Sequence, residues 1–217
     1  MGIESNVFFC TSCLNMSTRP RITFDSRGWC NACQWAEEKK TFDWSARQKE
    51  LKDTFEKYRS RTDGFDCVVP VSGGKDGSYV AYNIKHKYGM RPLTVTVQPP
   101  LTLEVGNKNL ENFKAQGYDH IHVSPNSEIM RDLNRIGFIE MGFPYFGWLV
   151  AIFSTVIRVA LAHGISLIFY AEDGEVEYGG STKNKNVGLF GIDYMKDVYF
   201  EGGYEQVMNQ VSYTNQE

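Results

Sequence analysis

Two kinds of feature are missing from this sequence: a long unbroken apolar run and a strong excess of charge of one sign. The longest apolar stretch, residues 143–170, is interrupted by Arg158, His163 and Gly164. We therefore expect a buried helix near 147–163 and no membrane span. The net charge is −3 at pH 7, whereas broad nucleic-acid binding usually requires a clear basic excess. The sequence thus predicts a protein that neither spans a membrane nor binds nucleic acid.

Cysteine is also scarce, and four of the five cysteines fall into two Cys-x-x-Cys pairs. Cys10 and Cys13 are separated by residues 14–29 from Cys30 and Cys33, a spacing that predicts a structural zinc site with four thiolate ligands. An iron–sulfur cluster and two disulfides are the alternatives. The first six residues show no charged-then-apolar signal sequence. This favours a cytoplasmic location, where thiols stay reduced and available to metal.

The segment Ser72–Ser78 reads Ser-Gly-Gly-Lys-Asp-Gly-Ser and directly follows the apolar run Cys67–Val71. Glycines allow the backbone to turn sharply and to approach a ligand, and a helix that starts here directs free N–H groups at that ligand. Ser72 and Ser78 add hydroxyl donors, and Asp76 is suited to a magnesium ion that bridges to phosphate oxygens. The segment predicts a phosphate-binding turn for a nucleotide, with an ordinary strand-to-helix turn as the alternative. It lacks the Gly-x-x-x-x-Gly-Lys-Ser/Thr pattern of the Walker loop.

Apolar runs alternate with amphipathic segments after the cysteine pairs, which predicts an α/β protein with a doubly wound parallel sheet. Cys67, the fifth cysteine, is expected to be a small buried residue in the first strand. We expect a zinc module over 1–43, a linking helix over 44–62 and a nucleotide-binding α/β domain over 63–217. The expected strands are 67–71, 93–97, 120–123 and 166–170, and the expected helices are 44–58, 77–88, 106–116, 127–135 and 147–163.

Each expected strand ends in polar or turn-forming residues, and ligands of such sheets bind beyond the carboxyl ends of the strands. The segments that should therefore surround one cleft are 72–74, 98–100, 124–126 and 172–175. The last of these is acidic. Glu172 and Glu175 are expected to bind magnesium or to accept a proton from an attacking amine, and a solvated acidic loop is the alternative.

The turn resembles the PP-loop of the N-type ATP pyrophosphatases, whose pattern is Ser-Gly-Gly-x-Asp-Ser and which cleave ATP between the α- and β-phosphates. Gly77 stands where that pattern has its second serine, and the hydroxyl follows at Ser78. The knuckle region Cys10–Cys33, the turn Ser72–Ser78 and the segment Glu175–Gly180 together look like the N-acetyl sugar amidotransferases. These enzymes serve bacterial surface-polysaccharide biosynthesis, including LPS and O-antigen. Members of that family are longer than this chain, so the resemblance implies either a missing C-terminal part or a shortened relative.

The resemblance implies an AMP-forming amidotransferase of ligase type. ATP would adenylate the acetamido oxygen of a nucleotide-linked N-acetyl sugar, and ammonia would replace that oxygen to give an acetamidino sugar. It also implies ATP, Mg²⁺ and Zn²⁺ as cofactors, and a separate glutaminase subunit, similar to that of imidazole glycerol phosphate synthase, as the source of ammonia. The implied catalytic residues are Asp76, Lys75, Glu172 and Glu175. The implied ATP-binding residues are Ser72, Gly73, Gly74, Lys75, Asp76, Gly77, Ser78 and Val97.

Two other functions fit some of the same residues. A tRNA-thiolation enzyme can combine cysteine-rich knuckles with a PP-loop, but the acidic charge balance and the absence of a spare cysteine pair argue against it. A non-catalytic scaffold that binds zinc and a nucleotide is the third interpretation.

Overall fold

The computed structural model describes residues 6–60, 62–171, 174–189, 191–200 and 204–211. The chain forms two compact units, one of residues 1–47 with 173–198 and the other of residues 48–172 with 199–217. The sequence predicts three consecutive segments, whereas each observed unit is built from two separate stretches. The reason is that residues after 174 hydrogen-bond to residues near the cysteine pairs.

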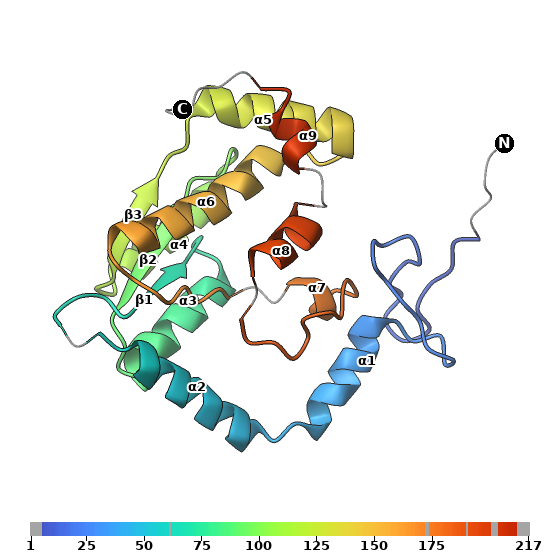
Figure 1. The fold of residues 1–217 in the computed structure, drawn as a ribbon, viewed down its shortest axis with the longest axis horizontal. Coiled ribbons are helices and arrows are strands. Elements are labelled where there is room, and N and C mark those ends of the chain that lie inside the picture. The colour runs from blue at the N-terminus through green and yellow to red at the C-terminus, as the bar shows by residue number, and fades with distance from the viewer. Residues whose placement is uncertain (1–5, 61, 172–173, 190, 201–203, 212–217) are drawn as a thin grey trace. The chain divides into compact units, whose positions relative to one another are not determined.

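The helices and strands in chain order are α1 Asn31–Glu38, η1 Lys39–Thr41, α2 Trp44–Tyr58, β1 Cys67–Pro70, α3 Lys75–Tyr82, η2 Asn83–Lys87, β2 Pro92–Val97, α4 Glu104–Lys114, β3 Asp119–Val123, α5 Ser127–Met141, α6 Phe146–Ala162, α7 Gly174–Glu177, α8 Ile192–Tyr194, η3 Met195–Tyr199 and α9 Tyr204–Met208 (Figure 1). The elements η2 and η3 are short π-helical turns.

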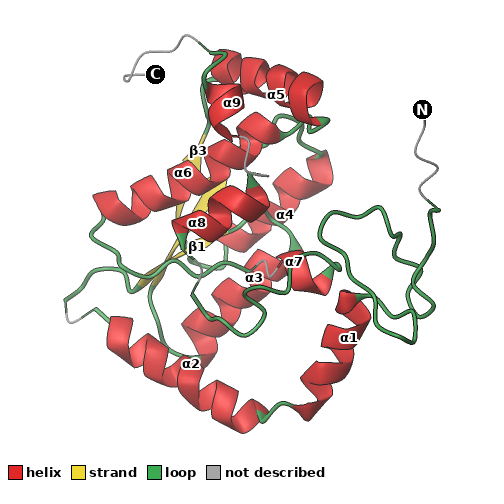
Figure 2. Ribbon diagram, turned by 45° about the vertical axis from the view of Figure 1, so that its right-hand side comes forward, coloured by secondary structure: helices red, strands yellow, loops and turns green. Residues whose placement is uncertain are grey.

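The second unit is built on a parallel sheet in the order β1–β2–β3 (Figure 1; strands in yellow in Figure 2). The strand expected over 166–170 is present only as a parallel bridge between Val68 and Ile168. The Val68 N–H donates to Leu167 O at 2.9 Å, and the Phe169 N–H donates to Val68 O at 2.8 Å. The next donor in this ladder would be residue 70, which is proline and has no N–H. The pairing therefore stops after one bridge.

The two faces of the sheet pack against different helices. Cys67, Val69 and Val71 point to one face, where α2, α3 and α4 contribute to the core. Val68, Leu93 and Val95 point to the other face, which α6 covers (Figure 1). Successive side chains of a strand alternate between faces, so a sheet with two buried faces needs apolar residues at consecutive positions. The Val-Val run in β1 supplies them.

The order of the strands makes the sheet doubly wound, as the sequence predicts. From β1 the chain moves outward through β2 to β3, and it returns through α6 to place Ile168 on the other side of β1. The direction of winding thus reverses beside β1. In open α/β sheets this switch point is where ligands bind, just beyond the carboxyl ends of the strands. The residues that follow β1 at this point are those of the Ser72–Ser78 turn.

The first unit contains the two cysteine knuckles, α1 and the segment that begins with α7. It has little regular structure apart from these helices and two isolated antiparallel bridges, Phe9 with Met16 and Phe24 with Cys30. Among all the helices that the structure describes, none has the length and apolar character needed to cross a membrane.

Candidate nucleotide and metal sites

The turn after β1 requires glycine at its second position. Gly73 has a φ of +79°, which an L-residue with a side chain rarely adopts. A Cβ at this position would lie 2.9 Å from Gly106 O and 3.0 Å from Leu110 N, both in the backbone of α4. Gly74 then acts as the N-cap residue of α3 with no side-chain hydrogen bond to the first turn. The first N–H groups of α3 are therefore left for an anion.

Gly77 holds the first turn of α3 against the end of β1. A Cβ here would lie 2.9 Å from Pro70 O and 3.2 Å from the Val71 Cα. This contact explains why glycine stands where the PP-loop pattern has serine, because a serine side chain would collide with the strand backbone. Sequence reasoning treated Gly77 as a departure and missed this packing role. The sequence feature that could have revealed this role is the position of Gly77 near the start of a helix that follows a strand. Glycine at such a position permits close packing of the helix against the strand.

Three polar side chains of the turn are placed by local hydrogen bonds. The Ser78 hydroxyl donates to Gly74 O at 2.7 Å, one turn earlier in α3. The Lys75 ammonium donates to the Asp76 carboxylate at 2.6 and 2.8 Å, and the Lys75 side chain is 88% exposed. Asp76 is 53% exposed and lies in the first turn of the helix, so its carboxylate is accessible to a cation from solvent. Val97, by contrast, is buried at the end of β2.

A pocket of roughly 490 Å³ lies beyond the carboxyl ends of β2 and β3. Two of the predicted strand-end segments line it, 98–100 and 124–125, together with residues of α5. The Ser124 hydroxyl donates to Gln98 Oε1 at 2.6 Å and ties these two segments together. Asn126 caps α5 by accepting the N–H groups of Glu128 and Ile129 at 3.0 and 3.2 Å. Three of the four predicted segments therefore lie at one edge of this sheet.

The fourth predicted segment, 172–175, is described only in part. Glu172 is outside the residues that the structure describes, and Glu175 belongs to the first unit. The Glu175 carboxylate accepts hydrogen bonds from Arg21 Nε at 3.3 Å and from the Ser181 N–H at 2.9 Å. Both of its oxygens also face the Arg21 guanidinium. This carboxylate is engaged within its own unit, which sequence reasoning did not foresee.

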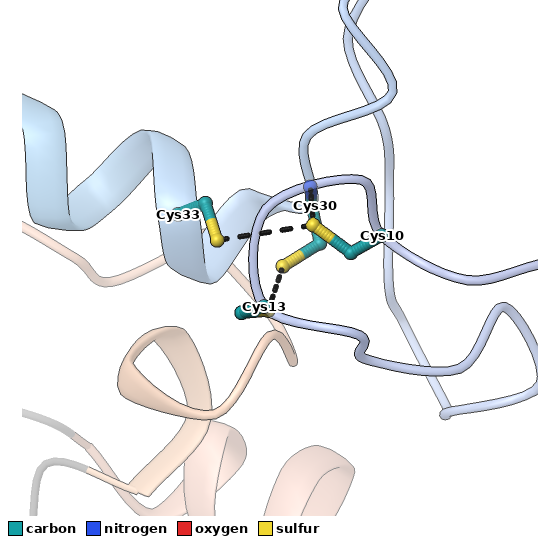
Figure 3. Close-up of side chains that lie close together, drawn as sticks. All are labelled: Cys10, Cys13, Cys30 and Cys33. Carbon is teal, nitrogen blue, oxygen red and sulfur yellow. Dashed lines mark hydrogen bonds between the residues drawn. The ribbon is translucent and has the colours of Figure 1, made fainter.

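The four knuckle cysteines form one cluster in the first unit (Figure 3). Their sulfur atoms all lie within 4.8 Å of one another. Cys10 Sγ lies 3.8 Å from Cys33 Sγ, and Cys13 Sγ lies 3.5 Å from Cys30 Sγ. These distances are far longer than a disulfide bond, and the five cysteines are free thiols. The structure thus brings together the four ligands that the sequence predicts.

The cluster fits a tetrahedral zinc ion. Four sulfurs about 2.3 Å from one zinc ion at tetrahedral angles lie about 3.8 Å from one another, close to the separations observed. The N–H groups of Ser12 and Cys30 point at Cys10 Sγ at 3.4 and 3.2 Å. Burial raises the pKa of Cys10, but these and other backbone hydrogen bonds outweigh it and lower the pKa to about 6. Backbone N–H donors of this kind stabilise a metal-bound thiolate.

Comparison with known proteins gives structural neighbours but no family. No protein-family model matches the chain, and no curated protein matches it. Among solved structures, 29 chains match. One is described as a predicted subunit of tRNA methyltransferase from Methanocaldococcus jannaschii, with 20% identity and a TM-score of 0.36 over 62% of this chain. This chain covers 61% of that structure, which is less than two thirds of its length.

A second structure is an NH3-dependent NAD synthetase from Campylobacter jejuni in complex with nitrate ion, with 15% identity and a TM-score of 0.44. That match covers 80% of each chain. Similarities at these TM-scores carry no argument about the reaction of this chain. Its candidate sites must therefore be interpreted from their own geometry.

Proposed function

We propose that this chain binds ATP at the Ser72–Ser78 turn and cleaves it between the α- and β-phosphates to adenylate an acceptor. The observation that carries this proposal is the turn itself, at the switch point of a doubly wound sheet. The backbone around the turn leaves no room for a Cβ atom at Gly73 or at Gly77. Backbone N–H groups at the start of α3 are suited to phosphate oxygens, and the positive end of the helix dipole adds to this.

The acceptor in this proposal is the acetamido group of a nucleotide-linked N-acetyl sugar. The amide oxygen attacks the α-phosphorus, and pyrophosphate leaves. Ammonia then adds to the activated carbon, and AMP departs with the former amide oxygen while a proton is lost. Asp76 is the residue that would hold Mg²⁺, which when bound offsets the charge that develops on the leaving pyrophosphate. Lys75 pairs with Asp76 at 2.6 Å, and in this proposal its ammonium would contact the same phosphates.

The pocket beyond β2 and β3 is our candidate for the nucleoside part of ATP. It lies at the same edge of the sheet as the turn, one strand further along. Its lining combines apolar surface from Met130 and three prolines with the polar groups of Gln98 and Asn134. Small-molecule pockets commonly have this mixture of apolar walls and few polar anchors. Replacing Met130 by tryptophan is expected to narrow the pocket and weaken ATP binding.

The ammonia in this proposal comes from a separate glutaminase subunit. Glutamine hydrolysis of this type requires an activated cysteine, and four of the five cysteines form the metal cluster. Cys67 is completely buried, and its burial raises the pKa to about 12, so it is a poor nucleophile. Ammonium salt should therefore replace the partner in the assay. Glutamine hydrolysis by the isolated chain would contradict the need for a partner.

The test is product analysis with ATP, Mg²⁺, ammonium salt and a panel of nucleotide-linked N-acetyl sugars. We expect AMP, pyrophosphate and a sugar whose mass falls by about 1 Da, since an oxygen is exchanged for NH. Asp76→Asn is expected to slow AMP release on the order of 100-fold. Glu111→Gln is the matched control, because Glu111 is an exposed carboxylate that pairs at 2.6 Å with Lys114 of its own helix.

Three outcomes would contradict the proposal. Formation of ADP in place of AMP would exclude cleavage at the α-phosphate. ATP binding without turnover on every sugar would favour the scaffold interpretation. Modification of added tRNA, with a steep salt dependence, would favour thiolation.

A further inference from the structure

Two asparagines that lie within two positions of the metal-ligand cysteines in the sequence donate hydrogen bonds to the backbone of Tyr178 and Gly180. Asn15 Nδ2 lies 3.0 Å from Tyr178 O and 3.8 Å from Cys30 Sγ, so one amide group faces both the segment and a ligand sulfur. Asn31 directly follows Cys30, is 4% exposed, and donates its Nδ2–H to Gly180 O. The backbone of residues 178–180 is therefore hydrogen-bonded to the knuckle region.

Gly179 shows how closely this backbone approaches the knuckles. Its φ is +88°, and a Cβ would lie 2.8 Å from Asn15 Nδ2 and 3.5 Å from Asn31 Oδ1. No other residue type fits between these two amide groups without displacing one of them. The glycine pair Gly179-Gly180 is thus explained by contact with the metal module.

The two acidic side chains of the segment also face the N-terminal residues. Glu175 pairs with Arg21. Glu177 accepts the Trp35 Nε1–H at 3.0 Å and pairs with the Lys39 ammonium at 2.7 Å. Val176, which lies between them in the sequence, is buried at 2% exposure. Both acidic side chains of the segment therefore pair with residues of the first unit.

We propose that the four-Cys centre is a metal-dependent anchor for residues 174–181, with Asn15 and Asn31 as the positioning residues. Metal binding fixes Cys13 and Cys30, and Asn15, two residues after Cys13, and Asn31, directly after Cys30, hold the backbone of the segment. In Figures 1 and 2, α7 lies beside the start of α1, in agreement with these hydrogen bonds. Glu175 and Glu177 act in this role as ion-pair anchors, and the Tyr178 side chain is 59% exposed. The proposal does not rest on the reaction proposed above.

The test is hydrogen–deuterium exchange of the full chain, measured with zinc bound and after removal of zinc by a chelator. We expect metal removal to speed amide exchange in peptides covering 174–181 by roughly tenfold or more, because their hydrogen bonds open with the knuckles. Peptides covering β2 in the second unit serve as the internal control and should not change. Equal exchange of 174–181 in both states would overturn the proposal.

Two variants separate the anchor from the metal site. In Asn15→Ala, all four ligands remain, so we expect about one zinc per chain with faster exchange at 174–181. Gly179→Ala should do the same through its clash with Asn15. Gly188→Ala is the matched control, since a Cβ there meets no atom within 4 Å, and its exchange should equal that of the unmodified chain. Unchanged exchange in both Asn15→Ala and Gly179→Ala, with zinc bound, would show that these contacts do not position the segment.

Discussion

Replacing Gly73 by alanine tests the central claim about the phosphate turn. The left-handed backbone at this residue costs an L-residue about 1–2 kcal/mol. The new methyl group would also lie 2.9 Å from Gly106 O and 3.0 Å from Leu110 N. These are backbone atoms of α4, which cannot swing aside as a flexible side chain can, so the helix must shift away from the turn. Overpacking of this kind costs about 1–3 kcal/mol.

We therefore expect Gly73→Ala to lower the free energy of unfolding by about 2–5 kcal/mol and to abolish ATP binding. The assay is urea unfolding followed by circular dichroism, together with calorimetric titration of ATP and Mg²⁺. Gly106→Ala is a matched control on the other side of the same contact. Its Cβ meets no atom within 4 Å, and it lies inside α4, so it should stabilise the chain by about 0.5–1 kcal/mol. Equal stability of the two variants, or normal ATP binding by Gly73→Ala, would refute this account of the turn.

Two further predictions concern single side chains. In a thiol-labelling assay, chelation of the zinc-loaded chain should release four reactive thiols, whereas Cys67 should react only after unfolding, because it is completely buried. Rapid labelling of a fifth thiol in the folded, chelated chain would contradict this. His120 donates its Nδ1–H to Thr94 Oγ1 at 2.9 Å, because the Thr94 hydroxyl itself donates to Asp119 O. Burial and the nearby Lys114 lower the pKa of His120 from 6.5 to about 4, so folding favours the neutral ring. The stability that this provides is present above about pH 6.5 and is lost as the pH falls toward 4. His120→Asn should therefore show a smaller loss of stability between about pH 7.5 and 5 than His122→Asn, measured by urea unfolding. Identical pH dependence in both variants would contradict the assignment.

Most of the second unit could be predicted from local sequence patterns. The apolar residues of the strands are continuous in β1, alternate with threonine in β2 and alternate with histidine in β3. The passage from a strand to a glycine turn and a helix marks the candidate phosphate site. The predicted strand over 166–170 is reduced to a single bridge, because strand pairing also requires N–H donors on the neighbouring strand. Its partner β1 ends at Pro70, which has no N–H to continue the pairing, and nothing within 166–170 reveals this.

The four-Cys cluster was predictable because its members come from two short, regularly spaced motifs. The role of residues 175–180 was not, since their partners lie more than a hundred positions away in the chain. The residue pattern of an acidic segment is the same whether its carboxylates bind a metal, face solvent or pair with arginine. Only the folded arrangement shows that Glu175 faces Arg21.

The contacts between the knuckles and residues 175–181 also affect the order in which the chain folds during synthesis. Asn15 and its partner Tyr178 are 163 positions apart. The cysteines can bind metal as soon as residue 33 has left the ribosome, and β1 to β3 emerge next. The first unit, however, stays incomplete until residues 174–198 have been made. Domains generally fold as units as they emerge, and a closing contact this distant is made late. The unit that is begun first on the ribosome is thus expected to be completed after the sheet of the second unit has formed.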